Sequence, residues 1–287
     1  MKVCIFGNGL ISLSIAKALI NQDIHVDIFS DNNKKKINKT RTLGLSDSNV
    51  EFYNKNICNI DKFLWNIGEI DIYSENLKNE KLLNFKNKHK KLFSIIKNDQ
   101  LYNYLLLNLK KSKYLKFKKT KKNLSKIKNE FKLIINCEAN NFLTKKFFFK
   151  KISKNYNSFA HTTIIQHKKI HNNVATQIFT KKGPIAFLPL SENETSIVYS
   201  VKGKKEIKFR DLILKYNPKY EITKFGDFSC FELISSNLRS YHNKNILAFG
   251  DLLHRLHPLA GQGFNMSIRD LKELIRIIKH KLDLGLD

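Results

Sequence analysis

The first thirty residues constrain the fold of this chain more than any other stretch. An apolar run at residues 2–6 leads into Gly-Asn-Gly, and a second apolar run follows at residues 25–29. Between these runs, apolar side chains recur at helical spacing, at Leu10, Leu13, Ala16, Leu19 and Ile20. This order predicts a strand, a glycine-rich turn, a helix and a second, parallel strand, the βαβ unit that opens many nucleotide-binding sheets.

The turn of this unit has the composition of a dinucleotide-binding loop. Glycines in GNGLIS permit a tight turn and let the backbone approach a pyrophosphate at the helix N-terminus. We therefore predict cofactor contacts from this turn and from the end of the second strand, where an acid usually binds a ribose hydroxyl. A plain βα turn without a ligand is the alternative. The predicted contact residues are Gly7, Gly9, Leu10, Ser12 (in place of the pattern's third glycine), Ser30 and Asp31.

The rest of the chain alternates between two patterns. Strands at 131–137 and 245–249 and helices at 98–110 and 263–280 continue the α/β pattern, and 67–73 alternates like a strand. Residues 159–201 predict an antiparallel sheet with a turn at Gly183 and Pro184, and the Lys-rich stretches 30–39 and 111–128 are typical of exposed loops or edges. We infer two interleaved domains: residues 1–66, 92–152 and 236–287 form the nucleotide-binding domain, and residues 67–91 and 153–235 form the substrate-binding sheet domain.

Composition sets limits on partners and compartment. The 52 Lys and Arg against 25 Asp and Glu give a net charge of +27, which would attract nucleic acid, anionic lipid or polyanions. Because the lysines are spread along the chain, we interpret the charge mainly as a solvated surface, and no RNA-binding or helix-turn-helix pattern supports nucleic acid. The four cysteines lack metal-ligand spacing, so we expect no metal and predict reduced, buried thiols. Without a spanning segment or signal peptide, a cytoplasmic protein is expected.

Residues 250–270, GDLLHRLHPLAGQGFNMSIRD, form the most specific motif of the chain. An apolar strand runs into Gly-Asp, then His-Pro, then Gly-Gln-Gly and directly into a long helix. The motif closely resembles the GDAAHxxHPxAGQGxNxGxxD pattern of the ubiquinone-biosynthesis hydroxylases, a family of class A FAD-dependent monooxygenases. The match fails at Leu252, Leu253 and Ser267. It holds at Gly250, Asp251, His254, His257, Pro258, Ala260, Gly261, Gln262, Gly263, Asn265 and Asp270.

Two further segments resemble the same family in the same order. GPIAFLPL at residues 183–190, with Ala175 and Phe179 before it, is similar to the AyErFtxxGPlAlLPL segment, and RTLGLS at 41–46 is similar to Arg-x-x-Ala-Leu-Ser. The resemblance implies an α/β fold in which a Rossmann-like FAD-binding domain of the para-hydroxybenzoate-hydroxylase type is interleaved with an antiparallel-sheet substrate domain.

The resemblance also implies where FAD would lie. The ADP half would lie on the first βα turn and the ribityl chain near Asp251, and the last helix would point its N-terminus at the pyrimidine edge of the flavin. Phe187, Leu188 and Pro189 would line the substrate pocket, although ordinary sheet core explains Phe187 and Leu188 equally well. The other implied cofactor contacts are Arg41, Glu138, Gly250, Pro258, Gly261, Gln262, Gly263, Phe264 and Asn265.

The implied activity is hydroxylation of a prenylated phenol ring in ubiquinone biosynthesis, with NAD(P)H and O2 as co-substrates. Because the flavin carries the chemistry, His254 and His257 are weak candidates for proton transfer, and packing or capping at the helix start is the alternative. The implied partners are the prenylated aromatic substrate, a ubiquinone-biosynthesis complex and the inner-membrane surface, where lysines near anionic lipid would favour peripheral attachment.

The chain departs from the family pattern between these motifs. CEANNFLTK at 137–145 stands where the family has ADGxxSxxR, a stretch that contacts FAD and NAD(P)H. Glu138 keeps the carboxylate, whereas Ala139, Phe142 and Lys145 replace glycine, serine and arginine. Family members also continue with further helices beyond the position of Asp287. These departures leave one alternative, a non-catalytic flavin-binding accessory subunit of a quinone-biosynthesis assembly. A flavin-dependent prenyl reductase is a further alternative because it shares the fold and the first βα turn, although the GPIAFLPL and AGQGFN matches favour the hydroxylase.

Overall fold

The computed structural model describes residues 1–30, 37–77, 80–86, 91–120, 124–203, 205–256 and 262–286. A six-stranded sheet has the order β16-β17-β9-β1-β2-β8, and all its pairs except β16 with β17 are parallel. β1 is buried on both faces, as is typical of parallel sheets. The strands are β1 (Lys2–Phe6), β2 (His25–Phe29), β8 (Leu115–Lys118), β9 (Leu133–Asn136), β16 (His242–Asn243) and β17 (Ile246–Ala248).

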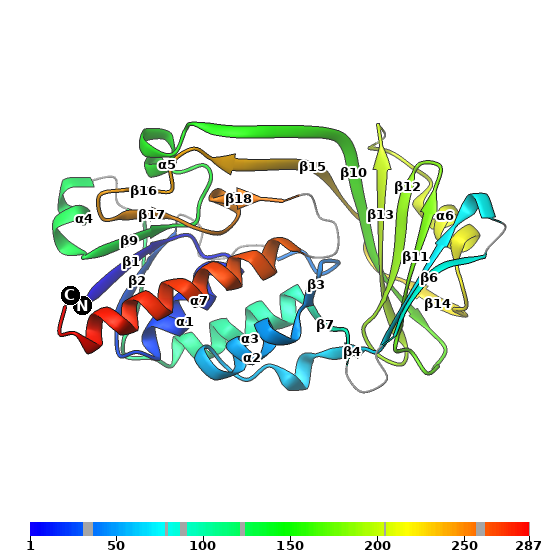
Figure 1. The fold of residues 1–287 in the computed structure, drawn as a ribbon, viewed down its shortest axis with the longest axis horizontal. Coiled ribbons are helices and arrows are strands. Elements are labelled where there is room, and N and C mark those ends of the chain that lie inside the picture. Colours follow the sequence, from blue (N-terminus) through cyan, green and yellow to red (C-terminus); the bar gives the residue numbers. More distant parts are fainter. Residues whose placement is uncertain are drawn as a thin grey trace.

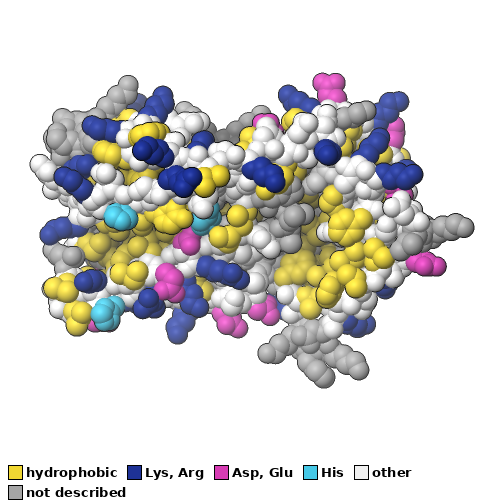
Figure 2. Space-filling model, turned by 45° about the horizontal axis from the view of Figure 1, so that its top comes forward, with side chains coloured by type: hydrophobic (Ala, Val, Ile, Leu, Met, Phe, Trp, Pro, Cys, Tyr) yellow, Lys and Arg dark blue, Asp and Glu magenta, His cyan; other side chains and the backbone are white. Residues whose placement is uncertain are grey.

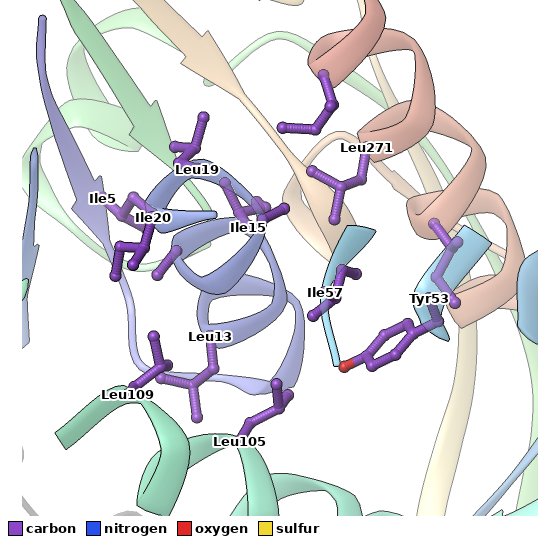
Figure 3. Close-up of a cluster of buried hydrophobic side chains, with 14 of the residues drawn as sticks. Ile5, Leu13, Ile15, Leu19, Ile20, Tyr53, Ile57, Leu105, Leu109 and Leu271 are labelled. Carbon is purple, nitrogen blue, oxygen red and sulfur yellow. The ribbon is translucent and has the colours of Figure 1, made fainter. Parts of the chain in front are cut away.

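Helices pack on both faces of this sheet (Figure 1). On one face, apolar side chains of α1 pack between the sheet, α3 and α7, as Leu13, Leu105 and Leu271 illustrate in Figure 3. On the other face, α4 and α5 close a smaller core that contains Phe6, Phe29 and Phe131. The helices are α1 (Leu10–Ile20), α2 (Asp47–Asn56), α3 (Asn98–Lys110), α4 (Leu124–Glu130), α5 (Phe142–Phe147) and α7 (Gln262–Asp283).

A nine-stranded sheet forms the second body of the molecule. Its order is β18-β15-β10-β13-β12-β11-β5-β6, with β14 paired to β10, and its pairs are antiparallel except for β11 with β5. One face packs against α6 (Phe209–Tyr216). The strands are β5 (Glu69–Ser74), β6 (Lys81–Lys86), β10 (Lys151–His167), β11 (Val174–Thr180), β12 (Gly183–Pro189), β13 (Glu194–Lys202), β14 (Ile222–Phe225), β15 (Ser229–Leu238) and β18 (His254–Arg255).

A small antiparallel sheet, β3-β7-β4, lies between the two larger ones (Figure 1). Its strands are β3 (Thr42–Leu45), β7 (Phe93–Lys97) and β4 (Trp65–Ile67). The long strands β10 and β15 reach from the second sheet back over the first (Figure 1). The predicted domain boundaries at 152/153 and 235/236 therefore fall inside these two strands, and the assignment of residues to domains stays a prediction. Short 3-10 helices are η1 (Asp61–Phe63), η2 (Glu75–Leu77) and η3 (Gly250–Leu252).

The α/β fold with an interleaved antiparallel sheet is confirmed, and two local predictions need correction. The Lys-rich stretch 111–128 contributes β8, an edge strand that agrees with the prediction, but it also contributes the first part of α4, a helix that the prediction of loops or edges did not include. Gly183 and Pro184 begin β12, and the turn lies at Lys181 and Lys182. Pro184 is tolerated there because a proline near the start of a strand sacrifices few ladder hydrogen bonds.

The cysteines differ in exposure more than the sequence predicts. Cys4 is buried, Cys58 and Cys137 are partly buried, and Cys230 is exposed on β15, so the prediction of buried thiols is wrong for Cys230. All four are free thiols. Within the described residues, no helix is long and apolar enough to cross a membrane.

A substitution at Gly183 tests how closely the start of β12 packs against the neighbouring strand β13. Its φ is +134°, and a Cβ there would collide with the carbonyl oxygen of Ser200, so we expect Gly183→Ala to lower the free energy of unfolding by at least about 2 kcal/mol. Gly203 has φ +73° but open space around a Cβ, so Gly203→Ala should cost only about 1 kcal/mol. Urea unfolding followed by circular dichroism measures both, and equal losses would contradict the clash.

Candidate cofactor site

Four parallel strands end at the same edge of the six-stranded sheet. Gly7 follows β1, Ser30 follows β2, Cys137 follows β9 and Phe249 follows β17. β1 lies between β2 and β9, so the connections from neighbouring strands leave in opposite directions. In open α/β sheets, ligands bind in the crevice outside the carboxyl ends of strands at such a point.

The first βα turn is tight and closely surrounded. Gly7 has φ +116°, and its N–H donates to the carbonyl oxygen of Phe29 at 2.9 Å. A Cβ on Gly7 would lie 3.0 Å from Glu138 Cγ and 3.1 Å from Ser12 Oγ. Ser12, which stands where the pattern has its third glycine, is only 1% exposed. Its side chain fits because Gly7 has none.

The N-terminus of α1 is open to an anion. Gly9 precedes the helix in an extended conformation, no side chain of the described residues caps it, and its first turn carries no acid. The first N–H groups of a helix have no partner within the helix and carry partial positive charge. This geometry agrees with the predicted role of Gly9 and Leu10 beside a pyrophosphate.

A buried amide network fixes the loop that follows β9. Asn136, completely buried, donates to Thr144 Oγ1 at 2.8 Å, and Asn141 donates to Asn136 Oδ1 at 2.7 Å. Asn141 also caps α5 by accepting from the Thr144 N–H at 2.9 Å. The Glu138 N–H donates to Asn136 Oδ1 at 3.2 Å, which places the Glu138 side chain at the first turn. Sequence reasoning missed this network, although an Asn at the end of a buried strand was a visible signal.

The Gly250-Asp251 pair lies against the start of α1. Gly250 has φ +65°, and a Cβ there would lie 2.8 Å from Ile11 Cγ2, so glycine is needed for both conformation and space. Asp251 is exposed. Burial raises the pKa of Cys137 to about 12; the Ser12 hydroxyl opposes this shift, and the Glu138 and Asp251 carboxylates add to it. Asp251, Glu138 and the first turn are therefore neighbours.

Asn265 joins the start of α7 to β3 and α2. Its Nδ2 donates to the Gly44 carbonyl at 2.7 Å, and its Oδ1 accepts from Asn49 Nδ2 at 2.7 Å and from the Ser46 N–H at 3.2 Å. The RTLGLS and AGQGFN motifs, more than two hundred residues apart, thus meet in space. Among the described residues, nothing lies within 4 Å of the position of a Cβ on Gly263, so in this part of the chain open space adjoins the first turn of α7.

His254 is fixed by Asp270 of the same motif. Its Nε2 lies 2.6 Å from Asp270 Oδ2, and its side chain is 12% exposed. The hydrogen bond with Asp270 raises the pKa of His254, and burial opposes the shift. Because Asp270 lies two turns inside α7, this contact joins His254 to the body of the helix and does not cap its start. The contact holds η3 and β18 against α7, which fits packing rather than proton transfer.

Other predicted cofactor residues lie at the margins of the crevice or outside the described residues. Ser30 is buried and its N–H donates to the Lys118 carbonyl at 3.1 Å, whereas Arg41 is exposed where the chain enters β3. In the first turn of α7, Gln262 is exposed and Phe264 packs partly against the core. The residues Asp31, His257, Pro258 and Gly261 lie outside the described part of the chain.

Of the three predicted pocket residues, only Leu188 faces the part of the molecule that contains the six-stranded sheet and β3. Leu188 pairs with Ser196, whose Oγ lies 3.1 Å from Thr42 Oγ1, so this sheet face looks toward β3. Phe187 and Pro189 point the other way, because neighbouring strand residues alternate, and Phe187 is completely buried in the core against α6. The prediction that Phe187 and Pro189 line the pocket is therefore wrong.

The Leu188 face continues into an exposed apolar surface. By strand pairing it includes Ile72, Gln177 and Ala186, and toward the sheet edge it presents Leu83 and Phe85 of β6 and Phe179 of β11. These last three side chains are about half exposed. Figure 2 shows hydrophobic side chains gathered over the part of the molecule that carries this sheet.

The described residues fit FAD. They offer a turn with glycine at positions 7 and 9, an uncapped helix N-terminus, an exposed carboxylate at Asp251 and open space at Gly263. A neutral Gly-rich turn and helix N-terminus suit the pyrophosphate, and the Asp251 carboxylate suits a ribityl hydroxyl. Glu138 works against an anion at the first turn.

The His254–Asp270 contact predicts a pH-dependent stability. Because the pKa of folded His254 is raised above its ordinary value of 6.5, the stabilisation is full below that value and is lost as pH rises through the folded pKa. Asp270→Asn should therefore lower the free energy of unfolding by about 1.5 kcal/mol in mildly acidic buffer and by less in alkaline buffer. Urea unfolding across pH measures this, with the exposed Asp283→Asn as control; a loss independent of pH would contradict it.

Comparisons with known proteins agree with this geometry. Residues 210–283 match the family described as FAD binding domain. The ubiquinone hydroxylase UbiL of Rhodospirillum rubrum is 27% identical over 143 residues, 46% of this chain and 33% of that protein. The 3-demethoxyubiquinol 3-hydroxylase of Escherichia coli is 30% identical over 119 residues, 38% of this chain and 30% of that protein. The matched part spans about a third of the length of these relatives.

Solved structures with the same fold cover nearly the whole chain. PqsL of Pseudomonas aeruginosa superposes with a TM-score of 0.77 at 14% identity over 99% of this chain and 87% of that one. The p-nitrophenol 4-monooxygenase PnpA of Pseudomonas putida gives 0.78 at 10% identity over 99% and 81%. HpxO of Klebsiella pneumoniae, solved in complex with FAD, gives 0.75 at 12% identity over 96% and 81%. Part of the chain is thus similar in sequence to ubiquinone-biosynthesis hydroxylases, and its fold is that of the FAD-dependent monooxygenases.

Proposed function

We propose that this chain binds FAD at the carboxyl edge of its parallel sheet and hydroxylates a prenylated phenol ring in ubiquinone biosynthesis. The observation that carries the proposal is the meeting of separate segments at one edge: Glu138 lies beside Gly7, Gly250 lies against Ile11 at the start of α1, and α7 contacts η3. Bound FAD would supply the redox chemistry, with NAD(P)H as reductant and O2 as the source of the hydroxyl oxygen. The family of its relatives, and FAD in a structural neighbour, support this choice.

The protein's own part would be binding, orientation and exclusion of water. The first turn and the N-terminus of α1 would hold the pyrophosphate, and the Asp251 carboxylate would accept a hydrogen bond from a ribityl hydroxyl. The positive end of α7 would stabilise negative charge on the flavin ring. Asn265 would keep that helix end in place through β3.

The exposed face of the second sheet supports an apolar aromatic substrate. Leu188, Phe179 and Phe85 lie on the side of the sheet that looks toward β3. An exposed apolar surface of this kind commonly marks a binding site, and a prenyl chain would bury it. The partners proposed with this activity are the prenylated phenol and a ubiquinone-biosynthesis complex.

A second candidate is a flavin-binding subunit without turnover. The altered stretch at 137–145 favours it, because Ala139, Phe142 and Lys145 replace the glycine, serine and arginine of a family segment that contacts both FAD and NAD(P)H. The two candidates separate in one assay of the FAD-loaded protein with NAD(P)H, O2 and a prenylphenol. Hydroxylated product supports the hydroxylase, whereas tight FAD binding without product supports the accessory subunit.

Asp251 tests the placement of the cofactor. Asp251→Ala should lower FAD affinity about tenfold to a hundredfold, because one charge-assisted hydrogen bond is lost. Flavin absorbance and fluorescence titration of the purified protein measure this, and Asp283→Ala, an exposed carboxylate at the far end of α7, is the control. Parent protein that cannot be loaded with FAD would overturn the proposal, and equal affinity of parent and Asp251→Ala would overturn the assigned role of Asp251.

A further inference from the structure

Two large apolar side chains project from the segment that links α5 to β10. Phe149 is 62% exposed and Ile152 is 57% exposed. Phe148, between them and α5, is buried in the core beside Phe131 and Leu143. Phe148 thus anchors the segment in the core, while Phe149 and Ile152 remain in contact with solvent. Exposing large apolar side chains to water is unfavourable.

Five lysines flank these two residues along the sequence: Lys145, Lys146, Lys150, Lys151 and Lys154. None of them forms an ion pair with another described residue, whereas lysines such as Lys2, Lys118 and Lys215 do. The sequence contains no Asp or Glu between Glu138 and Glu192. We call Phe149, Ile152 and these five lysines the α5–β10 surface.

The lysines and aromatic rings of this region are interleaved. Lys146 Nζ lies 5.7 Å from the centre of the Phe147 ring, and Lys150 Nζ lies 5.9 Å from that of Phe149. Figure 2 shows Lys and Arg side chains among hydrophobic ones at the upper left, the end of the molecule that carries α5 in Figure 1. Aromatic and aliphatic groups with cations beside them suit the boundary between lipid headgroups and acyl chains.

Neither protection of a sheet edge nor binding of a nucleic acid accounts for the whole surface. Residues 151–155 pair with β15 on one side only, and lysines on such an edge protect a sheet from aggregation. That role explains Lys151 and Lys154, but it leaves the exposure of Phe149 and Ile152 unexplained. A nucleic acid would attract the lysines and could stack on Phe149, but an aliphatic Ile152 offers a base neither stacking nor a hydrogen bond.

We propose that the α5–β10 surface binds the surface of an anionic lipid membrane, with Phe149 and Ile152 entering the headgroup region and the five lysines facing anionic headgroups. α5 starts directly after the loop that carries Glu138, so the bound membrane would lie near the candidate cofactor site. Membrane binding by this surface does not depend on FAD, and it adds a lipid partner to the proposed function.

The test uses the purified full chain and vesicles of phosphatidylcholine with or without phosphatidylglycerol. The triple variant Lys150→Gln/Lys151→Gln/Lys154→Gln should bind anionic vesicles about a hundredfold more weakly than the parent, since each lysine near such a surface contributes about a fivefold gain in affinity. Lys110→Gln/Lys111→Gln/Lys113→Gln removes the same charge from exposed positions at the end of α3 and should bind like the parent. Circular dichroism verifies that both variants are folded.

Insertion is tested separately. Phe149→Trp should show fluorescence quenching by brominated lipid beyond that of the parent, whose single tryptophan is Trp65, and Ile152→Ser should weaken binding with all lysines retained. Equal loss in both triple variants would overturn the proposal in favour of nonspecific charge. Absence of added quenching, or a parent that binds RNA through these lysines but no vesicle, would also overturn it.

Discussion

The site depends on the position of β1, which is hydrogen-bonded in parallel to β2 on one side and to β9 on the other. Because all these strands run in one direction, residues after positions 6, 29, 136 and 248 emerge at one edge of the sheet. There is little room for a side chain at position 7, because Ser12 and the Glu138 side chain approach Gly7 from two sides. A larger residue at Gly7 would displace one of them, so the parallel pairing and the glycine act together.

The parts of the fold that depend on local pattern could be predicted from the sequence. The apolar spacing of α1, α3 and α7 and the runs of β1 and β2 reveal which side of each element is buried, and the motif at 250–270 is dense enough to indicate the family. What the sequence could not provide was the partner of each polar side chain. The contact of Asn265 with Gly44, the pairing of His254 with Asp270 and the Asn136 network all cross between elements whose docking is decided by the packed core. The error at Phe187 had a similar cause, because a resemblance identifies a strand but strand alternation and the location of α6 decide which face is buried.

A series of polar contacts joins the part of the molecule built on the six-stranded sheet to the nine-stranded sheet. Asn265 ties α7 to β3, Thr42 of β3 bonds to Ser196 of β13, and Thr40 bonds to Thr162 of β10 at 2.7 Å. Hydrogen bonds are directional, so these contacts fix the second sheet relative to the start of α7 more narrowly than apolar packing would. The apolar face around Leu188 is thereby held at a fixed distance from the cofactor edge. Segments that lie far apart in the sequence are thereby brought together beside the candidate cofactor site.

The net charge of +27 is distributed over the molecule in a way that the composition alone does not reveal. Asp27, only 3% exposed in its side chain, holds Lys118 at 2.6 Å and Lys2 at 3.2 Å, so these lysines compensate a carboxylate beneath the sheet edge. Other lysines pair with glutamates on exposed loops, where each pair contributes little. The lysines of the α5–β10 surface have no such carboxylate among the described residues, and they lie close in sequence to the exposed side chains of Phe149 and Ile152. A purely compositional bias toward lysine would scatter unpaired cations without regard to apolar exposure, so their coincidence on one anchored segment is what calls for a partner with both an anionic and an apolar component.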